Sequence, residues 1–442
     1  MIRHIFPMLI RKRTFCVKAQ GNSMLPLFHP GDVVYVKKIH LSKIKKDDII
    51  FVYKDKKPMI HRVIYIAYHS NKKIRYFITK GDNNPHSDGK VYPRNIYGVV
   101  YQIKQKNQIF KMDELYLIQS SLYFNEILKI KKAFEKNKID FLFLKGLPLH
   151  FYYEKKYPGR LFADCDILAR IKDEFKIKKI FQNCKYTAEI TEYSKTHKKL
   201  KDKLTEITLF KIIHGFPVTF DIHFEPVFLM NQIGKINALY PDYLMEKMTE
   251  LFLKEKCVIN YRENTYPILS PVNLITYLSL HFFHHNFRQI YRLSLLNYVL
   301  KSIPNTKKSD FYNNLAQTIH TFKIEGFVYP SFILLKKYTN SGIPDNFIKE
   351  IKPDESKVKY IKKNILNINV FNTESRITAG INRFKNIFFL SPNSLLKKFL
   401  ILFNIQVTYS LYWTAKMKIK NMTIGRLRRL NQTKESVGHS IG

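Results

Sequence analysis

A short turn bounded by Gly and Pro, with a serine inside it, constrains this chain most strongly. Residues 21–26 read Gly-Asn-Ser-Met-Leu-Pro, and the β-branched run 33–36 follows closely. Gly and Pro favour a tight turn, and β-branched residues favour a strand. The pattern predicts a turn that presents Ser23 beside its own backbone N–H, as acyl transfer requires, although a lone serine in a turn is most often only a turn residue.

Two further polar clusters follow within the first hundred residues. His61 lies in the strand-like run 59–64, and Asp82 and Asp88 lie in and after the polar turn that ends a second such run. A neutral histidine can take a proton from serine near pH 7, and a carboxylate can fix the histidine tautomer. The sequence alone does not bring these side chains within hydrogen-bonding reach.

Residues 18–103 resemble the catalytic domain of type I signal peptidases, in the archaeal and endoplasmic-reticulum-like branch. The serine turn, the His-Arg-Val segment and the Thr-Lys-Gly-Asp-Asn-Asn segment occur in the order and spacing of that family. The resemblance implies Ser23 as nucleophile, His61 as general base, Asp88 as orienting acid and Asp82 as a second carboxylate with a structural role. It further implies a small, mostly antiparallel β-fold without a cofactor, which cleaves after small residues in an extended peptide or preprotein.

The apolar anchor that precedes the serine in this family has no counterpart in residues 1–20. The apolar run there covers only 5–10, far short of the ~20 residues of a spanning helix. The segment also lacks the cleavage-site pattern of a secretory signal peptide. We therefore expect a cytoplasmic protein that is either soluble or peripherally bound to a membrane.

Composition excludes some classes of protein. The 442 residues suggest two or three domains, and a hydrophobic content of 45% is ample for a buried core. The four cysteines show neither metal-ligand spacing nor a disulfide framework, which fits a reducing compartment. The net charge of +40 is spread along the chain without a basic stripe interleaved with aromatic residues, so we expect no nucleic-acid partner.

A second acidic cluster lies farther along the chain. Asp164 and Asp166 alternate on one predicted strand, and Asp221 lies on another strand at 216–223. Carboxylates at i and i+2 with a third on a neighbouring strand form a plausible site for a hard cation such as Mg²⁺. The alternative is a solvated strand end, which is the more common meaning of Asp-x-Asp by itself.

Residues 113–300 resemble uncharacterised nucleotidyltransferase-like proteins of the polymerase-β superfamily. The resemblance rests on 144–146, Arg160, 164–168 and 221–223. It implies that the three aspartates bind Mg²⁺ or Mn²⁺, and that Lys145 and Gly146 lie beside the phosphates of a nucleoside triphosphate. Two positions differ: the superfamily's Gly-Ser is Gly146-Leu147 here, and Asn297 stands where this subgroup tends to have aspartate. The fold could therefore persist without the activity.

Helices are expected from Ser270 onward. The helix that opens at Pro271 carries His281, His284 and His285; a zinc site would need a third ligand, so we expect these side chains to pack with their polar tips outward. The uncharged segment 399–415 is short for a membrane span. We expect a buried helix there, with an interfacial helix on anionic lipid or a membrane anchor as alternatives.

Together these patterns predict an α+β multidomain chain. The expected parts are a mostly-β peptidase-like domain at 1–103, a polar linker at 104–112, an α/β nucleotidyltransferase-like domain at 113–300 with its core to about 260, and a helical region with a basic tail at 301–442. The leading hypothesis is a serine endopeptidase that cleaves a peptide precursor or leader. One alternative is a metal-dependent nucleotidyltransferase that modifies a peptide or small acceptor, with the N-terminal module as its peptide-binding domain. The other is a catalytically silent binding protein.

Overall fold

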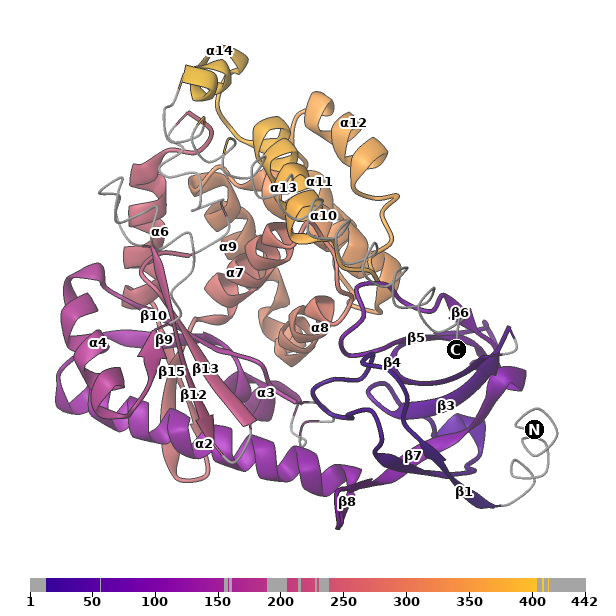
Figure 1. Ribbon diagram of the computed structural model, residues 1–442. Coiled ribbons are helices and arrows are strands. Elements are labelled where there is room, and N and C mark those ends of the chain that lie inside the picture. The colour runs from indigo at the N-terminus through magenta and orange to yellow at the C-terminus, as the bar shows by residue number, and fades with distance from the viewer. Residues whose placement is uncertain are drawn as a thin grey trace, which may run out of the picture.

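The computed structural model describes residues 13–55, 57–154, 158, 161–188, 205–213, 216–226, 229, 238–403, 408 and 412. They form an N-terminal β-sheet, a second sheet flanked by helices, and a C-terminal helical part (Figure 1). The predicted α+β multidomain class is confirmed.

The N-terminal sheet has eight strands within the described residues, in the order β1-β2-β7-β3-β4-β5-β6, with β8 paired to β7. Within the described residues, neighbouring strands of this sheet pair antiparallel, as expected. Alternate residues of β2, Val34 and Val36, are fully buried, because side chains alternate between the two faces of a strand. The strands are β1 (Thr14–Lys18), β2 (Val33–Lys37), β3 (Ile49–Lys54), β4 (Lys57–Tyr68), β5 (Ile74–Lys80), β6 (Lys90–Val91), β7 (Ile96–Gln105) and β8 (Gln108–Lys111).

The segment 104–112 is not the expected polar linker. β7 continues through Gln105, and β8 returns along it, so that Phe110 pairs with Ile103. Phe110 also packs against the N-terminal core, which explains why the segment folds as a hairpin. The next helix, α2 (Met112–Lys136), begins directly after this hairpin.

Helix α2 is shared by two hydrophobic cores. Its first turns contribute Met112, Leu115 and Tyr116 to the N-terminal core. Later turns, including Ile127 and Phe134, are fully buried in the core of the second sheet. With 25 residues the helix is about 37 Å long, and Figure 1 shows it running from β8 along the second sheet. It therefore joins the two parts without a flexible linker.

The second sheet is mixed and has seven strands within the described residues, in the order β11-β12-β13-β10-β9-β15-β14. β10 pairs with β13 in parallel, and β15 pairs with β9 in parallel. Its strands are β9 (Phe141–Lys145), β10 (Cys165–Ala169), β11 (Thr187–Ala188), β12 (Glu206–Ile213), β13 (Phe216–His223), β14 (Cys257–Tyr261) and β15 (Asn264–Ile268); its helices are α3 (Leu147–Glu154), α4 (Glu174–Asn183) and α6 (Asp242–Lys254).

The helical part lies beside both sheets (Figure 1). Its helices are α7 (Pro271–His284), α8 (Arg292–Ser302), α9 (Lys308–Thr321), α10 (Glu325–Tyr338), α11 (Asp345–Glu350), α12 (Glu355–Asn364), α13 (Arg376–Leu390) and α14 (Leu395–Phe399). It touches the N-terminal sheet, because the ring of Tyr65 on β4 lies 6.1 Å from that of Tyr338 and 5.3 Å from that of Phe371. Lys46 also donates a hydrogen bond to Ser294 on α8.

The segment 399–415 differs from expectation. It begins at the end of α14 and continues as a short 3-10 turn, Leu400–Phe403. Ile401 is buried, but Phe399, Leu400 and Phe403 are more than half exposed, so the expected buried helix is wrong for these residues. Most of 404–415 lies outside the described residues. Within the described part of the chain, no helix has the length and apolar character of a membrane span.

Two candidate active sites

Buried apolar side chains on either side of Ser23 hold its turn against the N-terminal core. Gly21 adopts a φ of +75°, which glycine tolerates best. The N–H groups of Leu27 and Phe28 both donate to the carbonyl oxygen of Met24. Met24 and Leu27 are buried in the N-terminal core, whereas Ser23 stays partly exposed at the surface of the turn.

Ser23, His61 and Asp88 come together as a hydrogen-bonded chain. His61 on β4 is 6% exposed, and its Nε2 lies 3.0 Å from Ser23 Oγ. Its Nδ1 lies 2.7 Å from Asp88 Oδ2. A carboxylate next to Nδ1 favours the tautomer with the proton on Nδ1, which leaves Nε2 to accept the Ser23 hydroxyl proton. The arrangement is therefore that of a serine nucleophile with its base and orienting acid.

Two residues without an assigned role in the sequence analysis hold Asp88. The hydroxyl of Thr79 donates to Asp88 Oδ2 at 2.7 Å, and the Asp88 N–H donates to the Thr79 carbonyl at 2.8 Å. Lys54 Nζ donates to the Asp88 backbone oxygen at 2.9 Å. Thr79 is fully buried on β5, at the start of the Thr-Lys-Gly-Asp-Asn-Asn segment. The role of Thr79 could have been inferred from its place in that segment.

Asp82 lies in a different interaction. Arg62 Nε and Nη2 donate to the two carboxylate oxygens of Asp82 at 2.7 and 2.6 Å. Arg62 Nη1 also donates to the Asp47 carbonyl and to the hydroxyl of Tyr116 on α2. Arg62 is buried, and its bidentate pair with Asp82 joins β4 to the turn that follows β5. The separate hydrogen bond to Tyr116 joins β4 to α2. Asp82 thus makes a structural contact and is not part of the hydrogen-bonded chain of Ser23, His61 and Asp88.

The acidic turn is also fastened to the serine turn. Asn83 N–H donates to the Ser23 carbonyl at 2.8 Å, and the Asn83 side chain donates to the Asn22 carbonyl at 3.1 Å. A Cβ at Gly81 would lie 2.6 Å from the Ser23 carbonyl oxygen. Because no side chain fits there, Gly81 permits the close approach that sets the two turns relative to each other.

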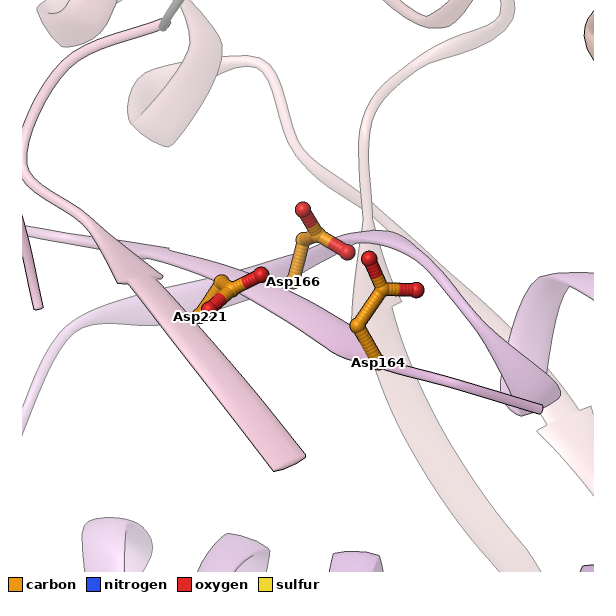
Figure 2. A group of neighbouring side chains, drawn as sticks. All are labelled: Asp164, Asp166 and Asp221. Carbon is orange, nitrogen blue, oxygen red and sulfur yellow. The ribbon is translucent and has the colours of Figure 1, made fainter. Parts of the chain in front are cut away.

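The second candidate site contains Asp164, Asp166 and Asp221, whose carboxylate oxygens lie within 4.8 Å of one another (Figure 2). Asp166 on β10 and Asp221 on β13 are register partners in a parallel pair. Asp164 comes just before β10, whereas the alternating pattern had predicted it on the strand itself. The three predicted metal ligands thus converge, as expected of a cation site.

A lysine and a histidine also contact these carboxylates. Lys145 Nζ lies 3.0 Å from an oxygen of both Asp164 and Asp166. His223 Nε2 lies 2.9 Å from Asp166 Oδ1. Burial and the charge of Asp166 raise the pKa of Asp221 to about 7. Three carboxylates that converge in this way offer the hard oxygen ligands that a divalent cation such as Mg²⁺ prefers, so the donor set fits such an ion.

Gly146 has a φ of +110°, and a Cβ there would lie 3.4 Å from Cys165. The adjacent Leu147 is fully buried at the start of α3. Its side chain therefore belongs to the core, and this position offers no hydroxyl to a phosphate. Arg160, which contributed to the resemblance, lies outside the described residues.

The three histidines of α7 are half-buried, and the expectation that their polar tips point outward is wrong. The ring centroids of His281 and His285 are 4.8 Å apart. Within the described residues, the metal-competent group of three ligands is the aspartate triplet, and these histidines do not form a second one. His281 contacts Arg292 at the start of α8, a contact that the helical spacing could not indicate because it joins two different helices.

Fold and sites together define a serine-peptidase-like β-domain joined to a nucleotidyltransferase-like α/β domain. Residues 103–340 match the model of the family described as uncharacterised nucleotidyltransferase, and residues 3–100 match the model of Peptidase S24-like proteins. The first match covers more than half of the chain, so the chain belongs to that nucleotidyltransferase family. Its N-terminal domain is Peptidase S24-like.

Curated relatives match the N-terminal domain. The signal peptidase complex catalytic subunit SEC11C of Homo sapiens is 35% identical over 74 residues, which is 16% of this chain and 38% of that protein. The subunit SEC11 of Zygosaccharomyces rouxii is 36% identical over 75 residues, which is 17% of this chain and 44% of that protein. The chain thus spans less than half the length of these relatives. The predicted resemblance to both families is confirmed.

Proposed function

We propose that the N-terminal domain is a serine endopeptidase that cleaves an extended peptide precursor or leader. The single observation that carries the proposal is the hydrogen-bonded chain from Ser23 Oγ through both nitrogens of His61 to Asp88. The likeness of this domain to signal peptidase catalytic subunits supports a peptide or preprotein as the substrate class.

Each residue of the chain has a role in this reaction. Ser23 Oγ attacks the scissile carbonyl carbon while His61 Nε2 takes the hydroxyl proton. Asp88 stabilises the resulting imidazolium, and the Ser23 N–H donates to the developing oxyanion. The imidazolium then protonates the leaving amine. A water molecule, deprotonated by His61, hydrolyses the acyl-enzyme and releases Ser23. No cofactor takes part.

The test combines a covalent probe with a peptide library. A fluorophosphonate probe should label the wild-type protein at Ser23, and the library, read by mass spectrometry, should show cleavage after small residues. Ser23→Ala should abolish both signals, with turnover lower by about 10⁴-fold or more. Ser70→Ala, on the exposed turn at the end of β4, is the matched control. Cleavage by Ser23→Ala at the wild-type rate would refute the assignment.

The second candidate function is metal-dependent nucleotidyl transfer to a peptide or small acceptor. The observation that favours it is the convergence of Asp164, Asp166 and Asp221. Bound Mg²⁺ or Mn²⁺ would polarise the phosphoryl oxygens of a nucleoside triphosphate and orient the acceptor. Lys145 supplies a positive charge beside the same carboxylates, suited to hold phosphate oxygens.

Calorimetry tests this second function directly. A nucleoside triphosphate should bind the wild-type protein more tightly with Mg²⁺ or Mn²⁺ than with EDTA. The double variant Asp164→Ala/Asp166→Ala should lose that metal dependence. If both proteins bind equally weakly, the domain serves as a scaffold and the catalytic function resides in the N-terminal domain alone.

The proposed site of action is the cytoplasm, where nucleoside triphosphates and divalent cations are available to the second domain. The exposed apolar residues around α14, together with Lys397, favour peripheral contact with an anionic membrane surface. No nucleic-acid partner is proposed. Both domains would then act on one peptide pathway, the first by cleavage and the second by modification.

A further inference from the structure

A buried glutamate of the helical part joins a short segment before α13 to the turn after α7. The side chain of Glu374 is only 7% exposed. It forms an ion pair with Arg288 Nε at 2.9 Å and accepts hydrogen bonds from Asn286 at 2.7 Å and from Asn382 at 2.6 Å. A buried carboxylate with a cation and two amide donors is held strongly, and the backbone on either side of it is held with it.

The turn after α7 depends on the same contacts. Asn286, Phe287 and Gln289 have positive φ angles between 52° and 70°, which residues other than glycine rarely adopt. Such a conformation persists where the surrounding contacts fix it. The Asn286 side chain donates both to Glu374 and to the carbonyl of Ala379 on α13, at 2.9 Å. The turn and the buried carboxylate therefore stabilise each other.

Arg288 contacts both ends of the segment 369–374. Its Nη1 donates to the carbonyl of Asn369 at 3.1 Å, while its Nε pairs with Glu374. Between these two points, the ring of Phe371 lies 5.3 Å from that of Tyr65 on β4. The segment is therefore held on one side by the turn after α7 and on the other side by the N-terminal sheet.

The same segment contacts the loop that leads to Asp88. Asn372 Oδ1 accepts hydrogen bonds from the N–H and the hydroxyl of Ser87, each at 3.0 Å. Thr373 donates its N–H and its hydroxyl to the carbonyl of Pro85, each at 2.7 Å. Because Asp88 directly follows Ser87, these contacts limit where its carboxylate can lie.

We propose that Glu374 is a positioning residue of the peptidase site. It fixes Asn372 and Thr373 on the helical part, and these two residues fix the loop before Asp88. The Asp88 carboxylate then stays 2.7 Å from His61 Nδ1, a geometry that the histidine base requires. The effect on rate rests on the proposed peptidase function, whereas the hold on the loop does not.

The test measures how fast a fluorophosphonate probe labels Ser23 in the full chain. Glu374→Ala should lower the maximal labelling rate about tenfold, because the loop before Asp88 gains freedom. The probe concentration that gives half of this rate should not change, since Asp88 acts on His61 and not on the probe. Glu374→Gln keeps the shape of the side chain but removes its charge, and it should give a smaller decrease. Arg288→Lys keeps the cation and should label within about twofold of the wild-type rate.

Glu126→Ala is the matched control. Glu126 lies on α2, and its side chain is 4% exposed. It accepts hydrogen bonds from Lys129, Lys211 and Tyr186, so its loss removes a comparable buried network. Glu126→Ala should lower Tm but leave the labelling rate per folded molecule unchanged. If it slows labelling as much as Glu374→Ala does, the effect is a general loss of stability and the inference is wrong.

A combined variant tests whether Glu374 acts through the segment. In Asn372→Ala/Thr373→Ala, the loop has already lost its side-chain contacts with the helical part. Adding Glu374→Ala should therefore slow labelling by less than about threefold, because residues that act in one chain of contacts are not additive. If the separate effects multiply in full, Glu374 acts by another route and the inference is wrong.

Hydrogen exchange distinguishes this inference from the proposed function, because it does not require catalysis. The Ser87 N–H, which donates to Asn372, should exchange about tenfold faster in Glu374→Ala than in the wild type or in Glu126→Ala. If the wild type is labelled and Glu374→Ala changes neither labelling nor exchange, the peptidase function stands and the inference is wrong. If the wild type takes no label at Ser23, the peptidase function is wrong and the positioning role is wrong with it, while faster exchange would still assign the hold on the loop to Glu374.

Discussion

Asn372 Oδ1 accepts hydrogen bonds from both the backbone N–H and the hydroxyl of Ser87, each at 3.0 Å. The next residue, Thr373, donates its N–H and its hydroxyl to the Pro85 carbonyl at 2.7 Å. These contacts join residues almost three hundred positions apart and end one residue before Asp88. The helical part of the chain thus holds the loop that leads to Asp88, the proposed orienting acid.

Loss of this contact should slow the peptidase without unfolding it. Asn372→Ala removes the acceptor for Ser87, so the loop before Asp88 gains freedom and the acid is held less well against His61. We expect fluorophosphonate labelling of Ser23 to slow by about five- to tenfold. Asn364→Ala, which removes an exposed side chain on α12, is the control. Equal labelling rates in the two variants would show that the contact has no role in positioning Asp88.

Thr79 offers a sharper test of how Asp88 is oriented. Thr79→Val keeps the shape of a fully buried side chain but removes the hydroxyl that donates to Asp88 Oδ2. Labelling and cleavage should fall about tenfold, because Asp88 loses a charge-assisted hydrogen bond. Thr79→Ser restores the hydroxyl and should recover most of the rate. If Thr79→Ser is as slow as Thr79→Val, packing rather than the hydrogen bond is what matters.

Asp82 should affect stability more than catalysis. Asp82→Asn leaves the buried Arg62 without its anion, a change that costs about 3–5 kcal/mol when one partner of a buried pair is removed. The free energy of unfolding from urea titration measures this loss. The rate of Ser23 labelling per folded molecule should change little. A stable Asp82→Asn protein with abolished labelling would instead make Asp82 part of the catalytic machinery.

The grouping of Ser23, His61 and Asp88 was predictable from the resemblance to signal peptidases, because that resemblance rests on three short segments within the first hundred residues. The segment around each of these residues has a recognisable sequence, and the fold brings the three side chains within hydrogen-bonding distance. The aspartate triplet was predictable for a similar reason, since strand alternation and a parallel register bring Asp166 and Asp221 side by side.

Long-range contacts were not predictable in this way. The Ser87–Asn372 contact depends on how the helical part packs against the N-terminal sheet, and no local sequence pattern encodes that packing. The hairpin at β7–β8 was also missed, because its polar turn resembles a linker until Phe110 is seen against the core.

The aspartate triplet should respond to metal in a characteristic way. Asp221→Asn should raise Tm in EDTA, because it removes a buried charge that Asp166 repels. Addition of Mn²⁺ should raise Tm of the wild type but not of Asp221→Asn, since ligand binding stabilises only the protein that binds. Asp310→Asn, in the exposed first turn of α9, is the control. If Mn²⁺ leaves the Tm of the wild type unchanged, the metal assignment is wrong.

The exposed apolar residues around α14 should bind an anionic membrane surface. Leu396 is 83% exposed and Phe403 is 82% exposed, with Lys397 between them in sequence. Apolar side chains next to a basic residue suit the surface of an anionic bilayer, where burial of each side chain contributes about 1.5–3 kcal/mol at most. The protein should therefore sediment with phosphatidylserine-containing vesicles and less with pure phosphatidylcholine vesicles, and salt should weaken the association.

Matched substitutions test whether vesicle binding depends on this apolar surface or on the positive charge of the protein as a whole. Leu396→Glu/Phe403→Glu should reduce vesicle binding at least tenfold by replacing apolar contact with charge repulsion. Phe175→Glu changes an equally exposed aromatic residue on α4, 79% exposed, and should leave binding intact. If Phe175→Glu weakens binding as much as the double variant does, the attraction is a property of the whole cationic surface. If neither variant nor salt has any effect on sedimentation, the apolar segment does not contact the bilayer.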